Sequence, residues 1–138
     1  MSFGEIYQIA GAGMNAQTIR LNTVASNLAN AGAAAQNPND AYRALKPVFS
    51  TIYNQVEGQV TSAQVDVAAI VETDAPLDMR YEPDHPFANE QGYVAYSNVN
   101  TVDEMADMMA ASRAFETSVE VMNRARSMQQ GLLQLGAN

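Results

Sequence analysis

The first thirty residues alternate apolar and polar positions in a regular way. Apolar residues recur in steps of three and four, with one polar interruption, along the series Phe3, Tyr7, Ala10, Met14, Gln17, Leu21, Val24, Leu28 and Ala31. This spacing predicts a long helix with a heptad seam along one side. Gly11 and Gly13 would either break this helix or allow another backbone to approach it closely. Residues 30–40, which contain a glycine, a proline and several asparagines, are expected to end it.

The last part of the chain predicts a second helix with a defined start. Thr101 and Glu104 fit a capping box, in which Thr101 is the N-cap residue and Glu104 reaches back to it. An apolar stripe follows, at Met105, Met108, Ser112, Phe115, Val119, Met122, Ala125, Leu132 and Leu135. Because both ends of the chain carry stripes of similar length, we expect the two helices to pair as an antiparallel coiled-coil-like hairpin. The methionines suit either an adaptable core or a groove that binds a partner.

Between the helices the period of the pattern changes. Val48–Val56 and Val60–Val71 are rich in β-branched and aromatic residues, and residues 57–59 separate them. This arrangement predicts a β-hairpin. Residues 73–98 contain three prolines and Gly92, and we expect them to form an extended loop.

These elements together predict an α+β fold with two regions. The terminal helices would form one helical domain from residues 1–35 and 99–138, and residues 36–98 would form a β-rich, extended middle segment. The length of 138 residues suits one compact domain, or two thin ones. Hydrophobic residues make up 47% of the chain but aromatic residues only 7%. We therefore expect helices that pack closely along their lengths rather than around large aromatic side chains.

Charge is unevenly distributed, and it excludes several classes of function. The chain has 15 acidic and 7 basic residues and a net charge of −8, most of it between residues 47 and 100. A pI of about 4.3 argues against nucleic-acid binding, because neutralising phosphates requires clustered lysine and arginine. No apolar run approaches the ~18 residues of a membrane span. The N-terminal segment lacks the basic and apolar regions of a secretion signal, so any export is expected to occur without a cleaved signal peptide.

One cluster suggests metal binding or acid–base chemistry: Asp78, Glu82, Asp84 and His85. Its spacing matches neither an HExxH motif nor an EF-hand, and the sequence has one histidine and no cysteine. No phosphate-binding glycine loop and no nucleophile elbow appears. We therefore expect a solvated turn, no metal, no cofactor, no small-molecule substrate and no enzymatic activity. A metal-dependent hydrolase that uses Asp84 and His85 is the enzymatic alternative.

The first helix lacks the charged outer face of a typical surface helix. Its face away from the seam carries amides, at Gln8, Asn15, Asn22, Asn27 and Asn30. Amides can be buried at lower cost than charges if they find hydrogen bonds. The chain's own fold could cover them, but we expect other copies of the chain to do so. The predicted helix-packing and assembly interface comprises Tyr7, Met14, Leu21, Asn22, Val24, Asn27, Leu28, Asn30, Met105, Met108, Phe115, Val119, Met122 and Leu132.

Two sets of short motifs carry a resemblance to a known family. Residues 12–17, 20–22 and 25–30 have the sequences AGMNAQ, RLN and ASNLAN, which resemble the N-terminal signature of the rod and hook proteins of the bacterial flagellum. A second set is similar to the proteins of the proximal rod: YEPDHP at 81–86, GYV at 92–94, NVN at 98–100, EM at 104–105 and ASRAFE at 111–116. The short length of the chain agrees with that subgroup.

The resemblance implies a structural subunit of the proximal rod, the drive shaft that crosses the periplasm from the membrane ring to the hook. The subunits would polymerise helically, with the terminal helices around the export channel and the middle segment outside. The implied partners are identical copies and the rod proteins FlgB, FlgF, FlgG and FliE. The implied export route is the flagellar type III apparatus.

One alternative from another class stays open. A secreted helical adaptor could capture a single partner without polymerising. A stable, fully helical monomer would favour this adaptor. Low helicity that rises on co-assembly with rod partners would favour the rod subunit.

Overall fold

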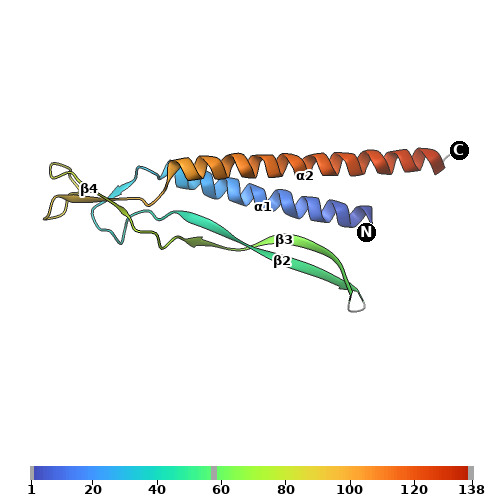
Figure 1. Ribbon diagram of the computed structural model, residues 1–138, viewed down its shortest axis with the longest axis horizontal. Helices are drawn as coiled ribbons and strands as arrows, with labels where there is room; N and C mark the ends of the chain where they lie inside the picture. Colours follow the sequence, from blue (N-terminus) through green and yellow to red (C-terminus); the bar gives the residue numbers. More distant parts are fainter. Residues whose placement is uncertain (1, 57–58, 137–138) are drawn as a thin grey trace.

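The computed structural model describes residues 2–56 and 59–136. Helix α1 spans Phe3–Ala29 and helix α2 spans Thr101–Gly136. The two helices lie side by side and antiparallel, so both chain termini are at the same end of the elongated molecule (Figure 1). Two small antiparallel sheets come from the chain between them. The predicted α+β class and the pairing of the terminal helices are confirmed.

Helix α1 begins with an unpredicted capping box. The Ser2 hydroxyl accepts a hydrogen bond from the Glu5 N–H at 3.3 Å, and the Glu5 carboxylate accepts one from the Ser2 N–H. The helix then continues through both glycines without a break. A Cβ at Gly13 would lie 3.3 Å from the Ser118 hydroxyl of α2, whereas one at Gly11 would meet nothing within 4 Å. Gly13 is therefore the point of close approach between the helices.

The predicted capping box at the start of α2 is wrong. The N-cap residue is Asn100, whose side-chain oxygen accepts from two N–H groups of the first turn at 3.0 and 3.5 Å. Thr101 is already the first helical residue. The carboxylate of Glu104 does not reach back, because Asn27 and Lys46 bind it in a buried position. Hydrogen bonds to a buried charged group are stronger than a surface cap.

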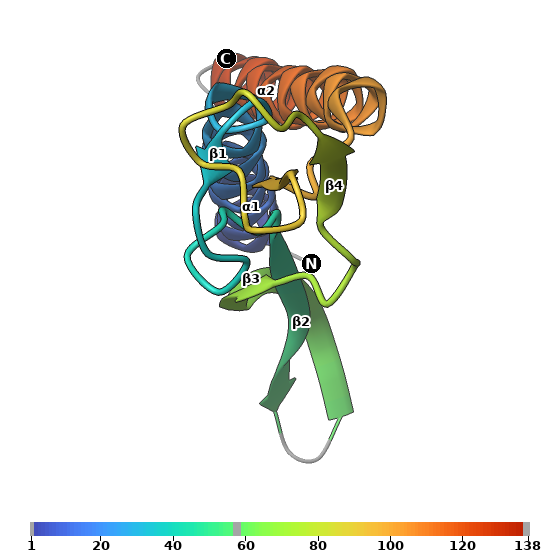
Figure 2. The same ribbon diagram turned by 90° about the vertical axis from the view of Figure 1, so that its left-hand side faces the viewer.

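The predicted hairpin is confirmed and is longer than expected. Strand β2 spans Leu45–Val56 and pairs with β3, Gln59–Glu72, in antiparallel register with two irregularities. Both strands contact α1. Viewed from the end, the molecule has three layers, with α2 on one side, α1 in the middle and the hairpin on the other side (Figure 2).

The prediction of an extended loop over residues 73–98 is wrong in part. This region contains β4, Asp78–Tyr81, and β5, Tyr93–Tyr96. They form a three-stranded sheet with β1, Ala34–Ala35, in the order β1-β5-β4. The strands are short, and β1 is about sixty positions away in the sequence from its partner β5. For this reason no local apolar run predicts this sheet. It lies at the end of the molecule opposite the termini (Figure 1).

The buried apolar side chains are small: Ala10, Ala16, Val24, Ala41, Ala44, Val94, Ala95, Ala111 and Ala125. Small residues let the layers approach closely but bury little area. The accessible surface is 9170 Å². A compact monomer of 14.9 kDa would expose about 7,000 Å². The chain therefore exposes roughly 2,000 Å² more than a globular protein of its mass.

Candidate assembly interface

The predicted apolar seam of α1 only partly coincides with its buried face. Val24 is 2% exposed and lies inside the fold. Tyr7, Met14, Leu21 and Leu28 are half-buried. These side chains keep one side accessible after the helix has packed against α2 and the hairpin. The apolar surface of α1 is therefore only partly covered within one chain.

On α2 the face toward α1 is rotated away from much of the predicted stripe. Its least exposed positions recur in steps of four and three at Glu104, Met108, Ala111, Phe115, Ser118, Met122 and Ala125. Met108, Phe115 and Met122 of the predicted set therefore lie on this inner face. Met105, Val119 and Leu132 do not, since they are 59%, 36% and 57% exposed.

The remainder of α2 presents a long unpartnered apolar surface. Its exposed large side chains are Val102, Met105, Met109, Val119, Val121, Met128, Leu132, Leu133 and Leu135. At 36 residues against 27, α2 is nine residues longer than α1 and extends about 14 Å beyond it. A bond from the Tyr7 hydroxyl to the Gln129 side chain, at 3.4 Å, lies near the end of the overlap.

Of the five amides predicted on the outer face of α1, three are exposed, and the prediction is wrong at Asn27. Gln8, Asn15 and Asn22 are exposed. Asn30 donates a side-chain hydrogen bond to the Ser26 carbonyl at 2.9 Å and so caps the end of the helix. Asn27 is fully buried within the chain's own fold.

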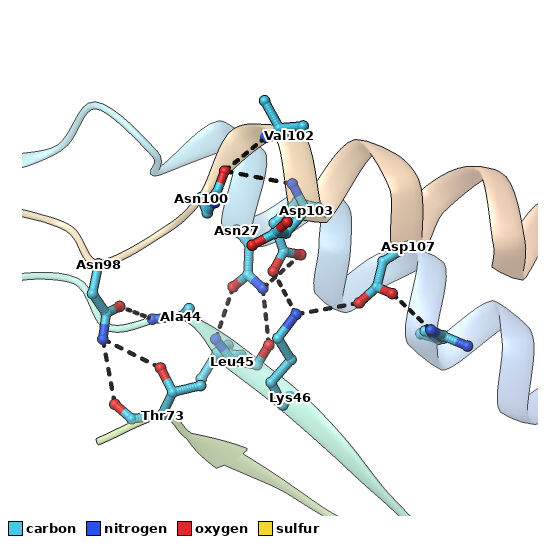
Figure 3. A network of polar contacts seen from close by, with 12 residues as sticks. Asn27, Ala44, Leu45, Lys46, Thr73, Asn98, Asn100, Val102, Asp103 and Asp107 are labelled. Atoms are coloured by element: carbon cyan, nitrogen blue, oxygen red, sulfur yellow. Dashed lines mark hydrogen bonds and ion pairs between the residues drawn. The ribbon is translucent and has the colours of Figure 1, made fainter. Parts of the chain in front are cut away.

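Asn27 joins α1 to the start of the hairpin (Figure 3). Its side-chain oxygen accepts from the Leu45 N–H at 2.8 Å and from the Tyr42 hydroxyl at 3.0 Å. Its side-chain nitrogen donates to the Leu45 carbonyl at 2.8 Å and to the Glu104 carboxylate at 3.0 Å. These four bonds use both donors and both acceptor positions of the amide. Only an asparagine-like group satisfies all of these partners at once.

An ion-pair network next to Asn27 joins α1, α2 and β2 (Figure 3). The Lys46 ammonium lies 2.7 Å from the Glu104 carboxylate and 3.2 Å from that of Asp107. Arg20 pairs with the second oxygen of Asp107 at 2.8 Å. The side chain of Glu104 is 3% exposed, so its charge depends on these partners. We refer to Arg20, Asn27, Lys46, Glu104 and Asp107 as the polar hub.

The hub shifts the pKa values of two of its members. Burial by itself would raise the pKa of Asp107, but hydrogen bonds from Arg20 and Lys46 outweigh it and hold the pKa below the ordinary value of 3.8. Burial by itself would lower the pKa of Lys46, but the carboxylates of Glu104 and Asp107 raise it above 10.5. Lys46 and Asp107 are therefore both charged at neutral pH.

Asn98, in the segment before α2, binds both ends of the hairpin through side-chain hydrogen bonds. The Asn98 side-chain oxygen accepts from the Ala44 N–H at 2.7 Å. Its nitrogen donates to the Thr73 hydroxyl at 3.2 Å and to the Ala75 carbonyl at 2.8 Å. The sequence pattern predicted no role for Asn98 or Lys46. Their signals were weak: a polar residue beside a predicted helix start, and the single lysine of the chain.

The candidate metal-binding cluster does not converge on one site. Asp78 pairs with Arg80 at 2.8 Å, and Glu82 accepts a hydrogen bond from the Tyr96 hydroxyl at 2.9 Å. The Nδ1 atom of His85 accepts an N–H from two residues further along at 3.1 Å. Over residues 2–56 and 59–136, no group of three or more histidine or acidic side chains is arranged to hold a metal ion. In the same ranges no helix is apolar over a length that would cross a bilayer.

Comparison with known proteins identifies the family. A family model described as flagella basal body rod protein matches residues 8–32, and one described as flagellar basal body rod FlgEFG protein C-terminal matches residues 90–135. The flagellar basal-body rod protein FlgC of Salmonella typhimurium is 41% identical over 136 residues, covering 99% of each chain. The chain belongs to the FlgC family of flagellar basal-body rod proteins.

The similarity to FlgC extends to distant bacteria. The FlgC protein of Escherichia coli O6:H1 is 42% identical over 99% of each chain. That of Borreliella burgdorferi is 32% identical over 87% of this chain and 88% of its own length. Membership of the FlgC family makes this chain a structural subunit of the flagellar basal-body rod. The two family models match much of α1 and most of α2, and α2 carries many of the exposed large apolar side chains.

Proposed function

We propose that this chain polymerises helically in the proximal part of the rod, as one layer of a hollow shaft that transmits torque to the hook. The observation that carries the proposal is the exposed apolar surface along α2, together with an accessible surface roughly 2,000 Å² larger than that of a compact monomer. Exposed apolar surface of this extent is typical of subunits that are completed by their neighbours.

The predicted interface residues have complementary roles in this proposal. Met105, Val119 and Leu132 face outward and would contact neighbouring subunits, together with the half-buried seam of α1. Met108, Phe115 and Met122 would hold α2 against α1. The helices of residues 1–35 and 99–138 would form the layer around the export channel, and residues 36–98 would lie outside them. The polar hub would transmit load between these two regions, because it crosses all three layers.

The remaining parts of the proposal follow from family membership. We infer that the partners are identical copies and the rod proteins FlgB, FlgF, FlgG and FliE. We also infer a place in the rod within the periplasm, export through the flagellar type III apparatus, and a mechanical rather than an enzymatic role.

The proposal is tested by placing a charge on the seam of α1. Leu28→Asp, or Leu21→Asp, should prevent rod assembly and motility, because the contact between subunits would then bury an unpaired carboxylate. Leu28→Met keeps the apolar contact and serves as the matched control. Because Leu28 is half-buried, the unfolding of both purified variants is measured as well. Normal rods in the Leu28→Asp strain would contradict the proposed seam.

A second experiment separates the rod subunit from the adaptor. The helicity of the purified chain is measured by circular dichroism, alone and with the other rod proteins. The rod subunit should gain helix on co-assembly, because its exposed apolar faces become buried. A fully helical monomer that binds one partner and forms no polymer would favour the adaptor. Basal bodies from a strain without this chain should show rings without a complete rod.

A further inference from the structure

An apolar groove of about 630 Å³ opens where the two helices meet the hairpin. Its lining includes Ile6, Ile9 and Gly13 of α1, which we call the floor, Val65 of β3, and Ser118 and Val121 of α2. None of its lining residues is charged. A groove of this composition suits an uncharged apolar helix better than a polar ligand.

The free end of α2 has the matching properties. Residues 127–136 contain no charged residue. Leu132, Leu133 and Leu135 in this segment are 57%, 68% and 77% exposed. Beyond Gln129, which binds Tyr7, the segment extends past the start of α1, so α1 does not cover its three leucines (Figure 1).

We propose that the C-terminal end of α2, residues 127–136, docks into the groove of a second copy of this chain. This inference rests on the proposed polymerisation and names the two surfaces that meet. The ten residues of the segment are about 15 Å long as a helix, and the floor from Ile6 to Gly13 is about 12 Å long. The leucines of the segment would fill the groove, and both surfaces are uncharged.

The charges next to the two surfaces are also complementary. Glu116 on α2 is exposed and is adjacent in sequence to Thr117, a lining residue of the groove. Arg126 is exposed and directly precedes the uncharged segment. An incoming helix would therefore bring the Arg126 guanidinium toward the Glu116 carboxylate, which favours this occupant and orients its approach.

The contact cannot form within one chain, because the segment and the groove lie on the same helix at different heights. Leu133 and Ser118 are 15 residues apart on α2, which corresponds to roughly 20 Å. If the two copies lie parallel, docking displaces the second one by about that distance along the helix axis. Each copy offers one segment and one groove, so the contact joins different surfaces and leaves both ends of the assembly open. Repetition of such a contact builds a helical assembly.

The natural sequence has no cysteine, which makes a disulfide test specific. Ile9→Cys and Leu133→Cys are expressed together, as two separate variants, in a strain that lacks the chain, and its basal bodies are isolated and oxidised. We expect a disulfide-linked dimer of twice 14.9 kDa. Its yield should be about tenfold above that with Asn15→Cys, an exposed position on α1, because docking raises the effective concentration of the thiols. Val121→Cys provides a second groove position if Ile9→Cys impairs assembly.

The possible results separate this inference from the proposed function. Dimers formed with Ile9→Cys or Val121→Cys but not with Asn15→Cys support the docking. Assembled rods without such dimers, or equal yields with Asn15→Cys, overturn it and leave the rod function intact. If Leu133→Cys forms a crosslink to a different rod protein instead, the claim that the segment docks into a second copy of this chain fails. If complete rods form without this chain, the proposed function itself fails.

Discussion

Removing the charge of Lys46 is the sharpest test of the polar hub. The substitution Lys46→Met keeps most of the apolar stem but deletes the ammonium that lies 2.7 Å from the Glu104 carboxylate. Glu104 is then buried with the Asn27 amide as its remaining partner within the hub. A carboxylate so placed must stay charged without a cation or take up a proton, and both outcomes destabilise the folded state.

The magnitude follows from the exposure of the two partners. Breaking a fully buried ion pair typically costs about 3–5 kcal/mol. The side chain of Lys46 is 39% exposed and that of Glu104 is 3% exposed, so water screens one end of the pair. We therefore expect a loss of about 2–3 kcal/mol in the free energy of unfolding. With a slope near 2 kcal/mol per M, this lowers the urea midpoint by roughly 1–1.5 M.

The assay is urea unfolding followed by circular dichroism, arranged as a double-mutant cycle. Lys46→Met/Glu104→Gln removes both charges and keeps an amide oxygen for Asn27, so it should recover most of the loss. The matched control is Arg124→Met, whose pair with Glu120 is exposed on both sides. It should cost less than about 0.5 kcal/mol.

Two results would refute the reasoning on the hub. One is a midpoint for Lys46→Met equal to that of Arg124→Met. The other is a double variant that loses the sum of the two single losses, because independent groups behave additively.

Three smaller predictions concern pH and the glycines. The folded chain lowers the pKa of Asp107, so this carboxylate contributes its full stabilisation above pH 3.8 and loses it as the pH falls below that value. The urea midpoint of Asp107→Asn, measured at several pH values, should therefore fall less in acid than that of the natural chain. Gly11→Ala should raise the free energy of unfolding by up to about 1 kcal/mol, and Gly13→Ala by less, because its Cβ would press on α2; equal gains would show that the helices do not approach closely there. Gly92 has φ of +80°, and a Cβ there would lie 2.8 Å from the Tyr81 ring. Gly92→Ala should therefore lower the stability by about 1–3 kcal/mol in thermal unfolding. An unchanged Tm would contradict this strain.

The elements that local patterns could predict are the ones that the structure contains. Steps of three and four along the first and last segments predicted α1 and α2, because a helix places such positions on one face. β-branched runs around a short break predicted the hairpin of β2 and β3. The family was also recognisable from short motifs in these helices and in the segment between them. All of this information lies within short stretches of the chain.

The tertiary structure decided which faces meet. The apolar residues of α2 lie on more than one side, so the pattern could not tell that Ala111 is buried while Met105 and Leu132 stay exposed. That choice depends on how closely two helices can approach, which small side chains and Gly13 determine.

The polar interior was likewise beyond the sequence. Asn27 has the same amide as its exposed neighbours on α1, and it is buried only because the backbone of Leu45 and the carboxylate of Glu104 come to it from other elements. By itself the sequence determined the helices, the hairpin and the family, because those depend on local order along the chain. The hub, the small sheet and the open groove depend on residues far apart in the chain, and only their packing in three dimensions brings them together.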